Sequence, residues 1–121
     1  MKKILIADDS LFMRKVLKDI LSSNAGEYEI VEAHSGRSSL EQFKKENPDL
    51  ILLDIIMPES EEEGLNVLRK IMKTKPEAKV VMITAVGQKL VMEECKKLGA
   101  KDYIIKPFDE EQVVKTVEKY L

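Results

Sequence analysis

The sequence predicts a doubly wound, three-layer α/β fold, in which a parallel sheet of five strands lies between two layers of helices. Short apolar runs alternate five times with longer amphipathic segments. Most of these runs lack the polar–apolar alternation of a strand with one face in water. No linker interrupts the five strand–helix units, which favours parallel strands joined by helical crossovers.

Five short segments are the expected strands, and four of them are rich in Ile, Val or Leu. Four of them have apolar side chains at consecutive positions, as expected of strands covered on both faces. The second is shorter and more polar, which indicates a strand at one edge of the sheet. In chain order the expected strands are residues 3–7, 29–32, 50–53, 79–84 and 102–105.

Five segments with apolar side chains at helical spacing are the expected helices. Ser10 is expected to cap the first, which ends near residues 24–26, and Asp109 to cap the last. Gly99 ends the fourth, because glycine readily adopts the left-handed conformation found after helices. The second, third and fourth helices are expected at residues 36–46, 65–73 and 88–98.

Length and composition indicate one domain, spanning residues 1–121, and exclude several classes of function. A net charge of −2 provides no field that would attract nucleic acid. The longest apolar runs, such as residues 50–53 and 80–83, are far too short to span a bilayer. Cys95 is the single cysteine, which excludes an internal disulfide and a cysteine-based metal cluster. We therefore expect a cytoplasmic protein without membrane insertion or nucleic-acid binding.

The ends of the expected strands carry the candidate functional residues. Asp8 and Asp9 follow the first strand, Asp54 follows the third, Thr84 ends the fourth and Lys106 follows the fifth. In open parallel sheets, ligands bind beyond the carboxyl ends of the strands. Any single aspartate there is more often a helix cap or a solvated loop residue, and Asp9 can cap the first helix. The joint placement of three carboxylates, a hydroxyl and an amine at one rim favours a functional site.

Three carboxylates at one rim require a compensating charge. Two unit charges about 4 Å apart repel by roughly 4 kcal/mol at an effective dielectric near 20. Mg²⁺ prefers carboxylate and water oxygens, whereas a zinc site would use the His or Cys ligands that are missing here. A carboxylate held beside Mg²⁺ and a lysine can attack phosphorus, with the metal and Lys106 neutralising the transferring oxygens and Thr84 donating to one of them.

As a set, these motifs resemble those of a response-regulator receiver domain. The segments ILIADDS (residues 4–10), DIIMP (54–58), TA (84–85) and KPF (106–108) follow the family's order and cover essentially the whole chain. The resemblance implies the flavodoxin-like or CheY-like fold, with a parallel sheet of strand order 2-1-3-4-5. The stretches 12–14 and 87–88 resemble the chemotaxis (CheY-like) branch of the family.

The resemblance also implies a role for each site residue. Asp54 corresponds to the phospho-acceptor, and Asp8 and Asp9 to the pair that positions Mg²⁺. Ile56 corresponds to the residue whose backbone carbonyl binds the metal.

The remaining motif residues correspond to the family's switch. Thr84 matches the switch hydroxyl and Lys106 the lysine that pairs with phosphoryl oxygens. Tyr103 matches an aromatic residue whose ring turns inward on activation. The Lys106–Pro107 peptide bond is expected to be cis, as is usual in the family.

The function implied by the resemblance is that of a stand-alone response regulator without an output domain. A CheA-like histidine kinase would donate the phosphoryl group, and a protein target would bind the face formed by the fourth helix, fifth strand and fifth helix. The protein would catalyse only its own phosphorylation and dephosphorylation, in chemotaxis or motility. The alternatives are a phosphorelay intermediate and the isolated receiver of a larger regulator.

Two other classes share parts of the pattern. A haloacid-dehalogenase-type phosphatase has its two aspartates two residues apart, whereas Asp8 and Asp9 are adjacent. A flavodoxin-like flavoprotein has a Ser/Thr/Gly-rich phosphate loop after the first strand, which is missing here.

One segment departs from the family pattern. Gly64, at the start of the third helix, lies two residues farther from Asp54 than the family usually has it, and the loop between them contains the acidic segment 59–63. The ordinary interpretation is a solvated loop, with glutamates favoured near a helix N-terminus. The alternative hypothesis is a partner-specific contact.

Overall fold

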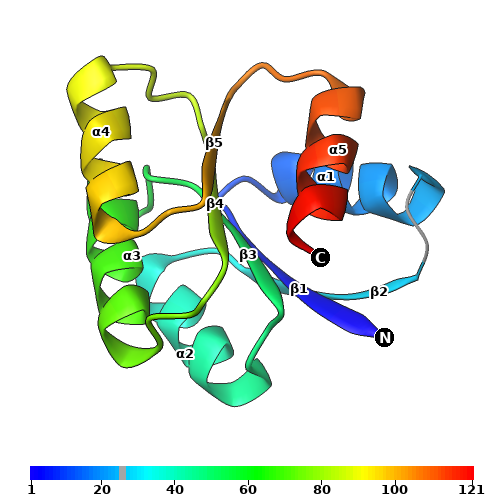
Figure 1. Ribbon diagram of the computed structural model, residues 1–121, viewed down its shortest axis with the longest axis horizontal. Coiled ribbons are helices and arrows are strands. Elements are labelled where there is room, and N and C mark those ends of the chain that lie inside the picture. The colour runs from blue at the N-terminus through cyan, green and yellow to red at the C-terminus, as the bar shows by residue number, and fades with distance from the viewer. Residues whose placement is uncertain (25–26) are drawn as a thin grey trace.

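The computed structural model describes residues 1–24 and 27–121 and has the α/β architecture that the sequence predicts (Figure 1). Within these residues the strands are β1 (Lys2–Ala7), β2 (Tyr28–Ala33), β3 (Leu50–Leu53), β4 (Val80–Thr84) and β5 (Asp102–Ile105). The helices are α1 (Leu11–Asn24), α2 (Gly36–Glu46), α3 (Glu63–Thr74), α4 (Lys89–Leu98) and α5 (Glu110–Tyr120). Every expected strand and helix is confirmed to within a few residues. The expected end of the first helix falls partly on residues outside those described.

The five strands are parallel and have the order β2-β1-β3-β4-β5, as expected. The more polar β2 lies at an edge, as predicted, but with six residues it is not shorter than the other strands. The order reverses direction at β1, which has β2 on one side and β3 on the other. Ligands bind at such a switch point in open α/β sheets, beyond the carboxyl ends of the strands. This is where Asp8 and Asp54 follow their strands.

Apolar side chains from both faces of the sheet form two separate cores. Figure 1 shows α2, α3 and α4 on one face and α1 and α5 on the other. Alternate residues of a strand point to opposite faces. Leu5 therefore packs in the core beside α2, α3 and α4, while Ile4 and Ile6 pack in the core beside α1 and α5. This explains why the central strands are apolar at consecutive positions. Because both faces are packed, the strand ends are held in a fixed arrangement.

The helix ends confirm the position of both predicted N-cap residues, but a side-chain capping bond at only one of them. The Ser10 hydroxyl accepts a hydrogen bond from the Met13 backbone N–H at 3.1 Å, as expected of an N-cap. Asp109 occupies the N-cap position of α5, but its side chain makes no capping bond. Gly99 ends α4 with a left-handed φ of 110°, as predicted. In the part of the chain that the structure describes, no helix is both long and apolar enough to cross a membrane.

Candidate functional site

The predicted site residues come together because neighbouring strands are in register. Ala7 of β1 is paired with Leu53 of β3, so the residues that follow them leave the sheet side by side. The backbone pairing continues past the strand ends. The Asp54 N–H donates to the Ala7 carbonyl at 2.9 Å, and the Lys106 N–H donates to the Thr84 carbonyl at 2.8 Å. These hydrogen bonds fix the backbone on which the side chains of the site are mounted.

A partly buried amine joins two buried carboxylates at this rim. Asp8 is 2% exposed and Asp54 is 5% exposed. The Lys106 Nζ donates to Asp8 Oδ2 at 2.6 Å and to Asp54 Oδ2 at 2.9 Å, and its side chain is 16% exposed. Thr84 lies at the same rim and is fully buried. The predicted convergence of the Asp8, Asp54 and Lys106 side chains is therefore confirmed, and Thr84 ends the neighbouring strand β4.

Asp9 completes a group of three carboxylates. Asp8, Asp9 and Asp54 each offer an oxygen, and these three oxygens lie within 4.8 Å of one another. Asp9 is exposed, so the group opens toward solvent. A compact set of carboxylate oxygens with an open side fits Mg²⁺, which accepts oxygen ligands and retains several waters. The Ile56 backbone N–H donates to Asp54 Oδ1 at 3.3 Å, and the expected metal contact of its carbonyl stays a prediction.

Burial and the neighbouring charges shift the pKa values of the charged groups. Burial raises the pKa of the Asp8 carboxyl, and the Asp54 charge acts in the same direction, against hydrogen bonds from Lys106 and the Ser10 backbone. Burial alone would lower the pKa of Lys106. The carboxylates of Asp8 and Asp54 outweigh that effect, so the pKa of Lys106 is raised and the amine stays charged.

Comparison with known proteins identifies the family. The model of the response regulator receiver domain matches residues 4–118. The chain is 44% identical to the chemotaxis protein CheY of Thermotoga maritima over 119 residues, covering 98% of this chain and 96% of that protein. It is 39% identical to the chemotaxis protein CheY of Bacillus subtilis, covering 98% of this chain and 97% of that protein. The chain belongs to the response-regulator receiver family.

Solved structures agree with this assignment. The CheY-like receiver domain protein of Methanospirillum hungatei has a TM-score of 0.89 and 28% identity, covering 98% of this chain and 92% of that one. A chain in the CheX–CheY–BeF3–Mg²⁺ complex of Borrelia burgdorferi has a TM-score of 0.89 and 33% identity, covering 98% and 87%. Receiver domains are signalling proteins rather than classical enzymes. The family match decides against the phosphatase and flavoprotein alternatives.

The expected switch residues of this receiver domain meet at Val86. The Thr84 hydroxyl accepts a hydrogen bond from the Val86 N–H at 3.3 Å. The Tyr103 hydroxyl donates to the Val86 carbonyl. Burial raises the pKa of Tyr103 to about 12, so the hydroxyl keeps its proton at neutral pH. The loop after β4 thus contacts the site residue Thr84 at one end and the β5 tyrosine at the other. The sequence alone did not indicate Val86 as this junction.

The backbone around the Asp54 of this receiver domain requires glycine at position 64. The Gly64 N–H donates to the Ile55 carbonyl at 2.7 Å. A β-carbon at Gly64 would lie 2.2 Å from the Asp54 carbonyl oxygen and 2.3 Å from the Ile55 Cα. Both atoms belong to the backbone and cannot rotate away. Helix α3 can therefore approach the Asp54 backbone only because residue 64 has no side chain.

The acidic loop of the receiver domain is anchored by Glu59. Its carboxylate accepts hydrogen bonds from the backbone N–H groups of Gly36 and Arg37, each at 2.9 Å. These N–H groups belong to the first turn of α2, and they hold the pKa of Glu59 below its usual range. Glu63, in the first turn of α3, follows the ordinary interpretation of the loop. Glu59 departs from that interpretation, because its carboxylate accepts hydrogen bonds from the N-terminus of α2 rather than α3. These bonds connect the loop after Asp54 to α2.

The Lys106–Pro107 peptide bond is cis, as the resemblance implied. It directly follows Lys106, the residue whose side-chain amine contacts both buried carboxylates.

Proposed function

We propose that this receiver domain accepts a phosphoryl group on Asp54 in a Mg²⁺-dependent reaction and thereby switches the binding of a protein target. The observation that carries the proposal is the buried Asp54 carboxylate. It lies 2.9 Å from the Lys106 amine and shares a cluster of carboxylate oxygens with Asp8 and Asp9. The expected phosphodonor is a CheA-like histidine kinase, and a small acyl phosphate would serve the same chemistry. A cytoplasmic location belongs to the same proposal.

The transfer forms one bond to phosphorus and breaks another. An oxygen of the Asp54 carboxylate attacks the phosphorus, and the leaving imidazole or carboxylate keeps the electron pair of the bond that breaks. Lys106 neutralises charge on the phosphoryl oxygens, and the Thr84 hydroxyl donates to one of them. Asp8, Asp9, Asp54 and the Ile56 carbonyl would hold Mg²⁺, which when bound stabilises negative charge on the transferring group.

Hydrolysis of the product requires water to reach the phosphoryl group on Asp54. A cavity of about 380 Å³ lies between the loops after β3 and β4. Ile56 and Val86 are among its lining residues, and both replace polar residues often found near the attacking water in this family. We expect these two apolar side chains to shape the approach of water, because each lies two residues after a site residue, Asp54 or Thr84.

Phosphorylation acts on the target-binding face through the loop after β4. The product adds a charge of about −1.5 to −2 and strong acceptor oxygens. To donate to such an oxygen, the Thr84 side chain would rotate. Its hydroxyl would then lose the hydrogen bond that it now accepts from the Val86 backbone N–H. Because Tyr103 donates to the same residue, the change reaches β5 and biases a two-state element.

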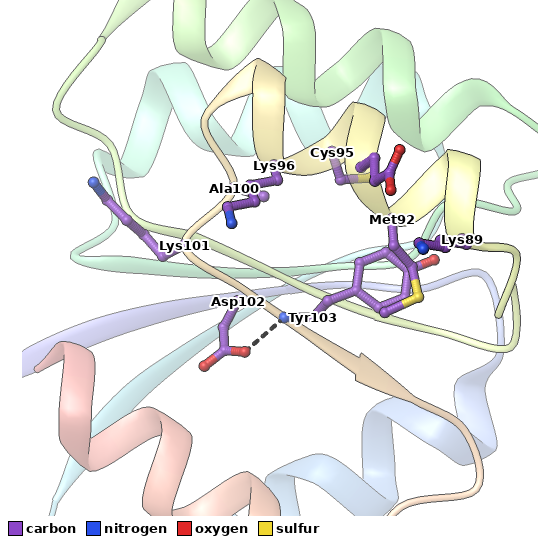
Figure 2. Close-up of a pocket in the computed structure, with 9 residues that line it drawn as sticks. Lys89, Met92, Cys95, Lys96, Ala100, Lys101, Asp102 and Tyr103 are labelled. Carbon is purple, nitrogen blue, oxygen red and sulfur yellow. Dashed lines mark hydrogen bonds between the residues drawn. The ribbon is translucent and has the colours of Figure 1, made fainter.

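The target-binding face of the proposal includes a cavity of about 370 Å³ between α4 and β5 (Figure 2). Its lining residues are Met92, Cys95, Ala100 and Tyr103, together with Lys89, Lys96, Lys101, Glu93 and Asp102. Figure 2 shows Lys101 at one end and Lys89 at the other. An apolar floor with lysines at its ends suits a target segment that combines an apolar side chain with acidic ones. Tyr103 belongs both to this cavity and to the contact with Val86, which connects target binding to the site.

Acetyl phosphate labelling tests the proposal. The wild-type protein should gain the mass of one phosphoryl group in Mg²⁺ and none in EDTA, measured by intact-mass spectrometry. Asp54→Asn should abolish the gain. Asp19→Asn, which changes an exposed aspartate of α1, should leave it unchanged. Persistent labelling of Asp54→Asn would refute the acceptor assignment.

A further inference from the structure

Arg14 lies behind the acidic pair in a position that the proposed chemistry has not used. Its side chain is only 13% exposed. Nη1 donates to the Asp8 carbonyl oxygen at 2.7 Å, and Nε donates to Glu32 Oε1 at 2.9 Å. That carbonyl belongs to the peptide bond between Asp8 and Asp9. The guanidinium therefore connects the backbone of the acidic pair to strand β2.

The β2 end of this connection is itself anchored. Glu32 is paired with Ile6 in the sheet, so its backbone is fixed beside β1. Its carboxylate accepts from Arg14 on one oxygen and from the Lys18 amine on the other, at 3.1 Å. Burial would raise the pKa of Glu32, but these two cations outweigh it and hold the pKa below its usual range. Glu32 is thus charged at neutral pH, and a planar guanidinium with two separate acceptors has a defined orientation.

Asp9 depends on the backbone for its direction. Asp8 is held at its N–H, which donates to the Ala33 carbonyl at 3.0 Å, and at its carboxylate by Ser10 and Lys106. Within residues 1–24 and 27–121, the Asp9 carboxylate has no hydrogen-bond or ion-pair partner. The Asp8–Asp9 peptide sets the direction of the Asp9 Cα–Cβ bond and so limits where that carboxylate can reach, and Arg14 holds this peptide through its carbonyl.

We infer that Arg14 is a positioning residue for the divalent cation. It orients the Asp8–Asp9 peptide so that both carboxylates face Asp54. The inference rests on the proposed function, since it assumes that Mg²⁺ binds this cluster. Partners that orient metal ligands in this way typically change metal affinity about 10- to 100-fold when removed.

The sign of the effect separates positioning from charge. Arg14 is a cation close to a cation site, so its charge alone opposes Mg²⁺ binding. Removing only that charge would strengthen binding. Removing a positioning contact would weaken it, because the Asp8–Asp9 carbonyl would lose the hydrogen bond that holds it and the peptide could turn further from its present orientation. A weaker site in Arg14→Gln therefore cannot be explained by the lost charge.

Isothermal titration with Mg²⁺ tests the inference on the wild type, Arg14→Gln, Arg14→Lys and the matched control Lys18→Gln. Lys18→Gln also removes a cation bound to Glu32 but does not contact Asp8. We expect Arg14→Gln to weaken Mg²⁺ binding at least about tenfold. Arg14→Lys, which keeps the charge but has one amine for two acceptors, should be weaker than the wild type. Lys18→Gln should bind as tightly as the wild type or slightly more tightly.

Two results would overturn the positioning role while the proposed function stands: Arg14→Gln binding Mg²⁺ as tightly as the wild type, or Arg14→Lys matching the wild type. If the wild type itself bound no Mg²⁺, the proposed metal site would fail and the inference with it. Urea unfolding of each variant checks the fold. If Arg14→Gln does not fold, the comparison of Arg14→Lys with Lys18→Gln decides.

Discussion

Replacing Lys106 with methionine should destabilise the protein in a way that Mg²⁺ reverses. Methionine has nearly the length of lysine without its charge, so the change removes the amine from Asp8 and Asp54 and leaves the packing of the side chain largely intact. Both carboxylates are buried and lose their contacts of 2.6 and 2.9 Å. Their mutual repulsion is then uncompensated unless a cation enters the site.

The magnitude follows from the separation of the charges. Two carboxylate oxygens at the 4.8 Å limit of this cluster repel by about 3 kcal/mol at an effective dielectric of 20. Removing one partner of a buried ion pair costs about 3–5 kcal/mol in other proteins. Since Lys106 is partly exposed, we expect the free energy of unfolding in EDTA to fall by about 3 kcal/mol, the lower end of that range.

Urea unfolding followed by circular dichroism measures this change in EDTA and in saturating Mg²⁺. The loss should shrink in Mg²⁺, because the cation replaces the missing positive charge. It should also shrink as the pH falls. The pKa of Asp8 is already raised, losing Lys106 raises it further, and a protonated carboxyl is not repelled by Asp54. Lys97→Met, at an exposed position of α4, should change stability by less than about 0.5 kcal/mol. Equal stability of Lys106→Met and the wild type in EDTA would show that the amine does not compensate the carboxylates.

Three further substitutions test the elements around the site. Gly64→Ala forces a β-carbon against the Asp54 backbone, so both acetyl phosphate labelling and urea stability should fall; an unchanged labelling rate would contradict the close approach. Glu59→Gln should cost about 1 kcal/mol in urea unfolding, because glutamine can accept only one of the two hydrogen bonds from the first turn of α2 and carries no charge there, whereas Glu61→Gln, the same charge change in the same loop, should cost less; equal losses would mean that charge alone matters. Tyr103→Phe removes the hydroxyl bond to the loop after β4 and should cost about 1 kcal/mol in the same assay; no loss would argue against that bond.

The positions of the acidic residues could be predicted because strand geometry determines them. Parallel strands in register bring the residues after Ala7 and Leu53 to the same rim, whatever the details of the helices. Thr84 and Lys106 follow from the same rule on β4 and β5. Periodicity thus located the main side chains of the site, and the resemblance supplied their expected roles.

Contacts that depend on how helices pack could not be read from the sequence. Arg14 reaches the Asp8 carbonyl only because α1 lies against the sheet beside Glu32. Glu59 caps a helix that begins 23 residues earlier in the chain, so no local pattern connects the two. At Asp109 the N-cap position was predicted correctly, but the capping bond of its side chain was not. Asp109 is a favoured N-cap residue in an extended conformation, yet its side chain makes no capping bond, since local preference does not decide where a side chain points.

A crystal structure of the protein grown with Mg²⁺ tests the central claim most directly. We expect one ion bound by oxygens of Asp8, Asp9 and Asp54, with the Lys106 amine still within hydrogen-bonding distance of the buried carboxylates. The account would be contradicted by a structure in which the three carboxylates point away from one another and the amine has turned toward solvent.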